Sequence, residues 1–277
     1  MGWYLVSKSK NEPWLDVLVK AWDERIKNEF APKDAKCGPQ ATPLKENGNF
    51  FSHDHIISNF SRIQKEGMSL IFLNLYMGVP IRGEATVLRV DGDEVTFRTN
   101  PLQELAIMHD NKAYILQNNV LSKPVKADVV YSNISQNEIT LRNFVYLLNL
   151  PASMRETTRV HPRRTTPVVI VDMQNRIGVE GIMFDISTGG LGVLSKNNDG
   201  IVEGAKIDIF FDLKEEKVSI ETEGEILDVI EYEDAYRFCI RFLPKDPNMQ
   251  EAINNYVQTR EKETIKSLSK ELEEYTK

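Results

Sequence analysis

The chain has 277 residues, enough for two domains of ordinary size, and its 41% hydrophobic and 27% charged residues are typical of folded globular proteins. The net charge of -7 argues against binding to DNA, RNA or anionic membranes, because those partners favour a basic surface. No run of about 18 apolar residues and no secretory signal is present, so we expect a cytoplasmic protein without membrane insertion.

The first predicted element is an amphipathic helix in the N-terminal region. Apolar residues recur there at helical spacings of three and four: Leu15, Leu18, Trp22, Ile26 and Phe30. A polar stretch rich in proline, lysine and glycine follows. We therefore assign residues 1–45 to an N-terminal helical segment.

From about residue 69 the pattern changes to short runs of β-forming residues. Six strands are predicted, at 70–76, 84–90, 94–98, 113–117, 125–132 and 138–144. The Asp91-Gly92-Asp93 turn between two alternating runs is typical of a hairpin. Residues 46–150 are expected to form a small antiparallel domain resembling a β-barrel.

A second set of strands follows a charged connection that starts near residue 151. These strands are predicted at 167–172, 179–185, 190–195, 206–212, 217–230 and 236–242. No helical pattern interrupts them, so a closed or nearly closed antiparallel barrel is the expected solution. With its connection, this domain covers residues 151–246.

Residues 247–277 are predicted to form a C-terminal helix. Two apolar groups lie along it: Met249, Ile253, Tyr256 and Val257, then Ile265, Leu268, Leu272 and Tyr275. The second group follows heptad spacing, but two heptads leave packing on the same chain as open an alternative as a coiled coil. The expected fold is mainly β: two small antiparallel β-barrels in tandem, with an N-terminal amphipathic helix and a C-terminal helix.

An arginine cluster lies in the connection before the second barrel. Arg159 and Arg163 are four residues apart, Arg164 follows directly, and Arg155 forms another such pair with Arg159. The planar fork of donors on arginine fits a phosphate group or the O6/N7 edge of guanine. Arg163 lies closer than Arg155 to the strand predicted to begin at residue 167.

A polar turn follows the arginines after one strand. Asp185 and Ser187 are two apart, so they are expected to project from one face, while Phe184 and Ile186 point to the core. A carboxylate accepts from the donors on guanine's other edge. Gly189-Gly190 would let the backbone turn tightly and approach a ligand.

Together, the Arg159-x-x-x-Arg163 pair and the Asp185-x-Ser187-x-x-Gly190 turn resemble the PilZ domain, a bacterial six-stranded β-barrel that binds cyclic di-GMP. The resemblance covers residues 155–246. It implies that the two arginines clamp guanine and phosphate groups and that the aspartate and serine contact the guanine and the phosphate. It further implies that the glycine meets a backbone requirement and that Arg164 and Arg155 add contacts.

The N-terminal β-region is similar in arrangement to the barrel that precedes the PilZ domain in flagellar brake proteins. This resemblance implies a signalling receptor in which bound cyclic di-GMP changes the interdomain orientation or the binding of a protein partner, such as a motor, secretion or polysaccharide machinery, and so regulates motility or surface behaviour. The alternative is a PilZ-like interaction module without nucleotide binding. The sequence leaves open whether one ligand or a stacked pair binds, the oligomeric state and the downstream partner.

Other chemistry is not expected. His53 and His55 lie two apart, but no spacing supplies further ligands, so no metal site is predicted. Two cysteines are too few for a disulfide-rich scaffold or a four-cysteine metal centre. No nucleophile elbow, phosphate-binding loop or dinucleotide fingerprint is present, and Asp185 and Ser187 have no neighbouring histidine base. We therefore predict a protein that is not an enzyme and has no cofactor.

Overall fold

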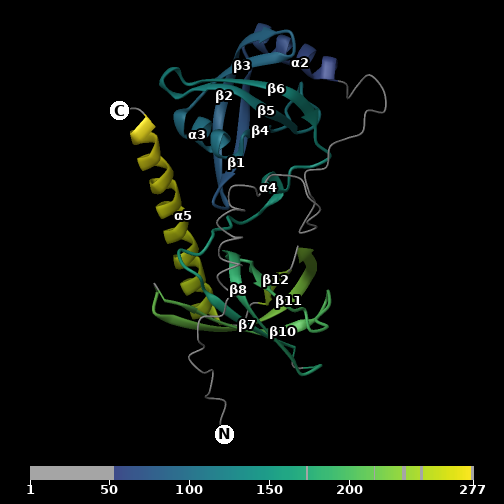
Figure 1. The fold of residues 1–277 in the computed structure, drawn as a ribbon, viewed down its shortest axis with the longest axis vertical. Coiled ribbons are helices and arrows are strands. Elements are labelled where there is room, and N and C mark those ends of the chain that lie inside the picture. Colours follow the sequence, from purple (N-terminus) through teal and green to yellow (C-terminus); the bar gives the residue numbers. More distant parts are fainter. Residues whose placement is uncertain (1–52, 173, 215, 233–234, 244–245, 276–277) are drawn as a thin grey trace.

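The computed structural model describes residues 53–172, 174–214, 216–232, 235–243 and 246–275. They form two closed antiparallel barrels of six strands each (Figure 1), which confirms the predicted fold class. The predicted N-terminal helix lies outside these residues. No helix in the described ranges is long and apolar enough to cross a membrane.

The N-terminal barrel contains every strand predicted for it. Its strands are β1 (Ser69–Tyr76), β2 (Val79–Asp91), β3 (Glu94–Thr99), β4 (Lys112–Ile115), β5 (Val125–Asn133) and β6 (Glu138–Tyr146). They follow the order β1-β2-β3-β6-β5-β4, and pairing of Phe72 with Ile115 closes the barrel. The predicted hairpin turn joins β2 to β3, and a 3-10 turn, η2 (Ile134–Gln136), joins β5 to β6.

Two helices in this barrel were not predicted. In α2 (His53–Glu66), Ile56, Phe60 and Ile63 are fully buried and pack the helix on β2 and β6. His53 and His55 both lie on this helix. The second helix, α3 (Pro101–Asp110), begins where the Asn100 side chain accepts from the backbone N–H of Gln103 at 2.8 Å.

The C-terminal barrel also has its six predicted strands. They are β7 (Pro167–Asp172), β8 (Ile177–Ser187), β9 (Gly190–Ser195), β10 (Lys206–Leu213), β11 (Val218–Tyr232) and β12 (Ala235–Leu243). The order is β10-β11-β12-β9-β8-β7, and β10 pairs with β7 to close the barrel. Alternating aliphatic side chains from these strands fill the interior.

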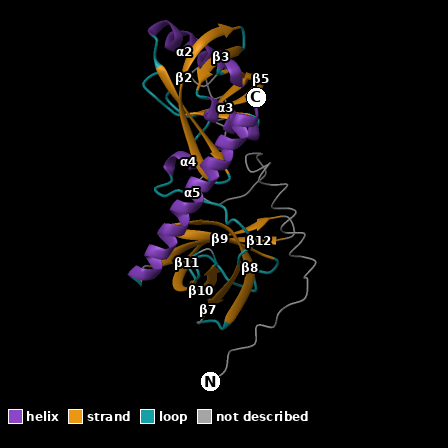
Figure 2. Ribbon diagram, turned by 90° about the vertical axis from the view of Figure 1, so that its left-hand side faces the viewer, coloured by secondary structure: helices purple, strands orange, loops and turns teal. Residues whose placement is uncertain are grey.

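The C-terminal helix, α5 (Pro247–Tyr275), runs along both barrels (Figure 2). Tyr256 and Val257 are buried in the apolar cluster of the C-terminal barrel. Leu268 is fully buried in the same cluster, which also includes Leu105 of α3. Residues from both apolar groups of the helix therefore pack against the same chain. Of the two predicted alternatives, this is packing on the same chain and not a coiled coil.

The two barrels meet at the turn between β1 and β2. Gly78 has a φ of 84°, and a Cβ there would lie 2.9 Å from the carbonyl oxygen of Arg159. The backbone N–H of His161 donates to the carbonyl of Met77 at 3.4 Å. Val79 shares an apolar cluster with Val160 of the connection. The arginine-bearing connection is thus packed against the N-terminal barrel rather than exposed as a free tether.

Candidate functional site

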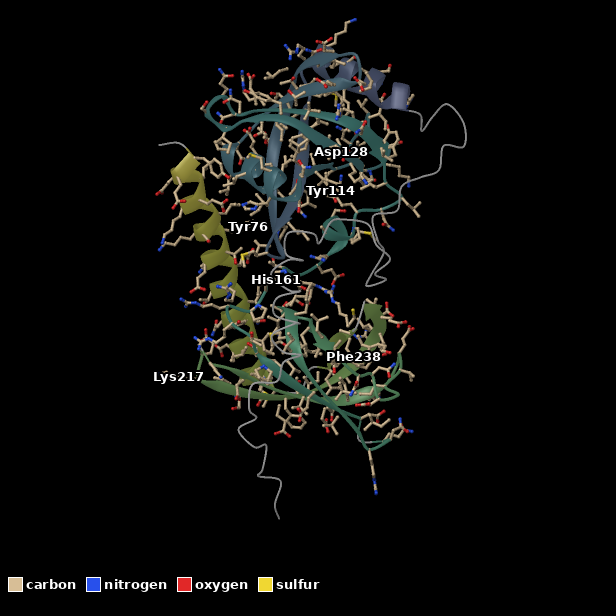
Figure 3. All side chains as sticks on the ribbon, viewed as in Figure 1. Tyr76, Tyr114, Asp128, His161, Lys217 and Phe238 are labelled. Carbon is tan, nitrogen blue, oxygen red and sulfur yellow. The ribbon has the colours of Figure 1, made fainter. Side chains whose placement is uncertain are left out.

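The connection between the barrels, which includes α4 (Pro151–Met154), is also fixed to β8. Val160 and Ile186 exchange backbone hydrogen bonds of 2.9 and 3.0 Å. The His161 ring is buried between the barrels (Figure 3), and its Nδ1 donates to the carbonyl of Phe184 at 2.9 Å. Because residues 160 and 161 are held on this strand, the preceding side chain, Arg159, reaches Asp185.

Asp185 is the electrostatic centre of the site. Only 4% of the residue is exposed, and its Oδ2 lies 2.8 Å from Nη2 of Arg237 and 3.7 Å from Nη1 of Arg159. Burial alone would raise the pKa of this carboxyl, but the charges of Arg237 and Arg159 hold the pKa below its ordinary value. Its Oδ1 is buried and accepts no hydrogen bond from the described residues. The carboxylate is therefore charged, and its Oδ1 oxygen is available to accept a hydrogen bond.

Arg237 of β12 belongs to the site, although no sequence motif nominated it. A β-bulge between Met183 and Asp185 shifts the register of β8 against β9. Phe184 is buried, as predicted, and the guanidinium carbon of Arg237 lies 4.1 Å from the centre of the Phe184 ring. The prediction that Ile186 faces the core is confirmed.

Ser187 and Gly190 shape the turn after Asp185. The Ser187 hydroxyl is buried and donates to the carbonyl of Gly190 at 3.2 Å. Gly190 does not have a positive φ; instead, a Cβ there would overlap the carbonyl oxygen of Ile240 on β12. This glycine is required by the close approach of β9 to β12, and not by the tight turn that the sequence suggested.

We expect Gly190→Ala to lower the free energy of unfolding by about 2 kcal/mol, because β9 and β12 would have to separate to admit the methyl group. Gly189→Ala is the matched control, since nothing lies within 4 Å of a Cβ at that position. Denaturant unfolding of both variants measures the difference. Equal stabilities would show that close packing is not the constraint at Gly190.

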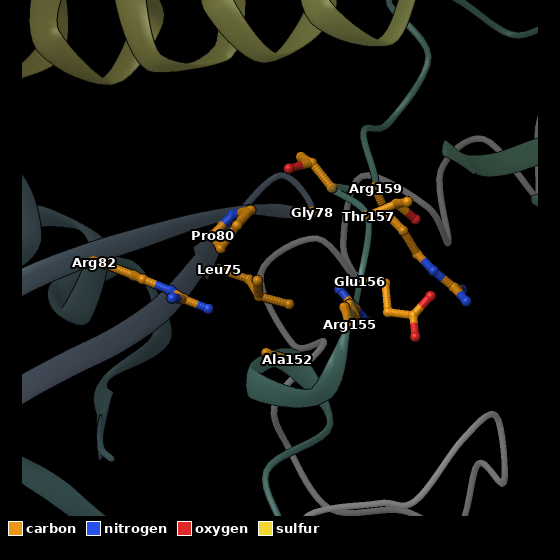
Figure 4. Close-up of a pocket in the computed structure, with 10 residues that line it drawn as sticks. Leu75, Gly78, Pro80, Arg82, Ala152, Arg155, Glu156, Thr157 and Arg159 are labelled. Carbon is orange, nitrogen blue, oxygen red and sulfur yellow. The ribbon is translucent and has the colours of Figure 1, made fainter. Parts of the chain in front are cut away.

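The arginines of the connection point in two directions. Arg155 and Arg159 line a cavity of about 330 Å³ beside the N-terminal barrel (Figure 4). Nη1 of Arg163 lies 3.8 Å from Oε1 of Glu263 on α5, and Arg164 is exposed. The structure thus brings Arg159 to Asp185 and places Arg155 in the same cavity, whereas Arg163 turns toward the C-terminal helix.

Comparison with known families identifies the segment that carries these residues. The model of the family described as "PilZ domain" matches residues 155–259, so the match begins at Arg155 and includes the whole C-terminal barrel and the start of α5. The resemblance drawn from the arginine and Asp-x-Ser motifs is confirmed.

Individual relatives are distant. An uncharacterized protein of Aquifex aeolicus (strain VF5) is 29% identical over 152 residues, which are 55% of this chain and 70% of that protein. Among solved structures, YcgR from Escherichia coli in complex with c-di-GMP is 12% identical with a TM-score of 0.41, covering 82% of this chain and 99% of that one. The K. pneumonia MrkH–c-di-GMP complex is 16% identical with a TM-score of 0.39, covering 75% and 93%.

Proposed function

We propose that this chain, which carries a PilZ domain over residues 155–259, is a receptor for cyclic di-GMP and not an enzyme. One observation supports this most strongly: Arg159 borders both an arginine-lined cavity and the buried carboxylate of Asp185. A cyclic dinucleotide with two phosphates and two guanines needs fixed cations and a carboxylate acceptor close together.

The proposed roles follow from these positions. Arg159 and Arg155 contact phosphate or the O6/N7 edge of guanine, and Arg163 and Arg164 are the further arginines able to close on the ligand from the connection. Asp185 accepts from the guanine N–H groups, for which its buried Oδ1 has no present donor among the described residues. The Ser187 hydroxyl is the second polar contact, once it exchanges its bond to the Gly190 carbonyl.

The proposed output is a change in interdomain orientation or in partner binding. The connection that carries the arginines contacts the N-terminal barrel through Gly78 and α5 through Arg163 and Glu263. A ligand that pulls these arginines onto its phosphates would compete with such contacts and favour a different arrangement. A protein of the motor, secretion or polysaccharide machinery is the proposed recipient, with control of motility or surface behaviour as the consequence.

Ligand-induced stabilisation tests the receptor role. Cyclic di-GMP at one hundred times its dissociation constant should add about 3 kcal/mol to the stability of the unit that binds it, and raise its unfolding midpoint by several degrees. Cyclic di-AMP is the control, because adenine lacks the O6 acceptor and the N–H donors to which the arginines and Asp185 are matched. An unchanged midpoint with saturating cyclic di-GMP would contradict the proposal.

A further inference from the structure

The last turns of α5 pack on α3 of the N-terminal barrel (Figure 2). Leu268 is fully buried there, in one apolar cluster with Leu105 and Ala106 of α3. The contact is separate from the cavity of Arg155 and Arg159, because none of the described residues that line that cavity belongs to α3 or α5. It joins the N-terminal barrel directly to the helix that follows the C-terminal barrel.

A charged contact lies beside this apolar one. Nε2 of His109, near the end of α3, lies 2.9 Å from Oε1 of Glu271 on α5. The other carboxylate oxygen, Oε2, accepts from the Tyr76 hydroxyl of β1 at 3.5 Å, and the rings of Tyr76 and His109 are 4.9 Å apart. Burial raises the pKa of the Tyr76 phenol, which therefore keeps its proton and donates to the carboxylate. One carboxylate of α5 is thus held by two side chains of the N-terminal barrel.

The strength of this contact depends on the charge of His109. A protonated imidazole attracts a carboxylate, whereas a neutral imidazole offers only a hydrogen bond. Among the described residues, the titratable side chains in contact with His109 are Glu271 from α5 and Tyr76 from β1. Asp110, the next residue on α3, accepts instead from Asn74. Histidine gains its proton between about pH 8 and pH 5, so the contact is strongest on the acid side of neutrality.

The two parts of α5 are anchored unequally. In the part that ends at Thr264, Nε of Arg260 donates to the carbonyl of His161 at 3.3 Å. The buried residues of this part are Ile253, Tyr256, Val257, Arg260 and Thr264. Beyond Thr264, Leu268 is the one buried residue in the described part of the helix. A segment with few buried contacts opens at a lower free energy than the core that it adjoins, so the end of α5 is the part most easily detached.

We propose that residues 265–275 of α5 form a pH-sensitive latch that closes on α3 and holds the two barrels together. Protonated His109 closes the latch through Glu271, and loss of that proton weakens it while both barrels stay folded. With the latch open, the connection and the turn between β1 and β2 remain as the link between the barrels. Acid therefore favours the arrangement seen here, independently of the nucleotide site.

Hydrogen exchange of the wild-type chain without nucleotide tests whether the latch opens by itself. The amides of residues 265–271 should be about tenfold or more less protected than those of β10, because their opening leaves the C-terminal barrel folded. Equal protection in the two regions would mean that the end of α5 opens only when the barrel unfolds, which overturns the inference.

The same measurement at pH 6 and pH 8 tests the charge of His109, with each rate corrected for intrinsic exchange at that pH. Wild-type protection of residues 265–271 should be about three- to fivefold higher at pH 6, as expected for a partly exposed ion pair. His109→Gln keeps a donor without the charge, so its protection should be low at both pH values. Glu271→Gln should give the same result, and the double variant should lose no more than either single variant.

Glu274→Gln is the matched control. It removes the same charge from an exposed position on the latch and should keep the pH dependence of the wild type. Wild-type protection that does not change with pH would overturn the inference, as would a pH dependence that His109→Gln retains. Neither result bears on the receptor function, because titration with cyclic di-GMP measures that function separately.

Discussion

Replacing Arg159 by alanine is expected to weaken cyclic di-GMP binding by about 100-fold or more. Arg159 is the side chain that lines the arginine cavity and also lies beside Asp185. Its loss should remove two charge-assisted hydrogen bonds to the ligand, each worth about 1.5–3 kcal/mol. Calorimetric titration measures the change. Arg142→Ala, at an exposed position on β6, removes the same charge away from the site and should leave affinity unchanged.

The same titration compares the two candidate arginine pairs. The sequence favoured Arg163 as the partner of Arg159, whereas Arg155 lines the cavity and Arg163 lies beside Glu263. From this placement we expect Arg155→Ala to weaken binding more than Arg163→Ala does. The reverse order would support the pair chosen from the sequence, with Arg163 leaving Glu263 to reach the ligand. If Arg155→Ala, Arg163→Ala and Arg159→Ala all bind like the wild type, the arginines of this connection do not clamp the ligand, and the assignment is wrong.

The second large effect is expected at Arg237 and is one of stability. Arg237→Ala should lower the free energy of unfolding by about 3 kcal/mol, because the buried Asp185 carboxylate would lose its nearest cation, while Arg159 lies farther away at 3.7 Å. Contact with the Phe184 ring is lost as well. Denaturant unfolding at neutral pH measures the change.

A double-mutant cycle isolates the charge from the packing. Asp185→Asn in the Arg237→Ala background removes the uncompensated charge, so the double variant should be more stable than the sum of the two single effects predicts. Additive losses would mean that the Arg237–Asp185 pair contributes no coupling, and that Arg237 acts only by packing on Phe184.

Acid should abolish the stabilisation that this ion pair provides. The folded-state pKa of Asp185 lies below its ordinary value, so the contribution is present above the unfolded pKa of about 3.9 and is lost as pH falls through the folded pKa. The difference in stability between the wild type and Arg237→Ala should therefore be fully present at pH 7 and shrink below about pH 4. A difference independent of pH would point to packing alone.

The strands were predictable because turn residues and alternation mark each of them locally. Both barrels and α5 follow from such patterns, and all twelve strands were found where they were expected. The helix α3 was missed although Asn100 and Pro101 supply a cap and a first-turn proline, since its buried residues fill successive positions and leave no amphipathic stripe. The helix α2, by contrast, was predictable, because Ile56, Phe60 and Ile63 recur at helical spacings and form a buried apolar stripe.

The candidate site was predictable only where its residues lie close together in sequence. Arg159 and Asp185 could be linked by motif spacing, but Arg237 comes from a strand much later in the sequence and reaches the site through the closure of the barrel. The β-bulge at Phe184 shifts the strand by one residue, which alternation cannot anticipate. Gly190 is likewise constrained by its close contact with Ile240 of β12, a strand much later in the sequence.

Calorimetric titration of the wild-type chain with cyclic di-GMP is the most direct test that this chain is a receptor. We predict saturable binding, with a stoichiometry that states whether one ligand or a stacked pair is bound, and its loss in the Arg159→Ala variant. Absence of measurable binding by a folded wild type, or binding that Arg159→Ala leaves intact, would contradict the receptor assignment.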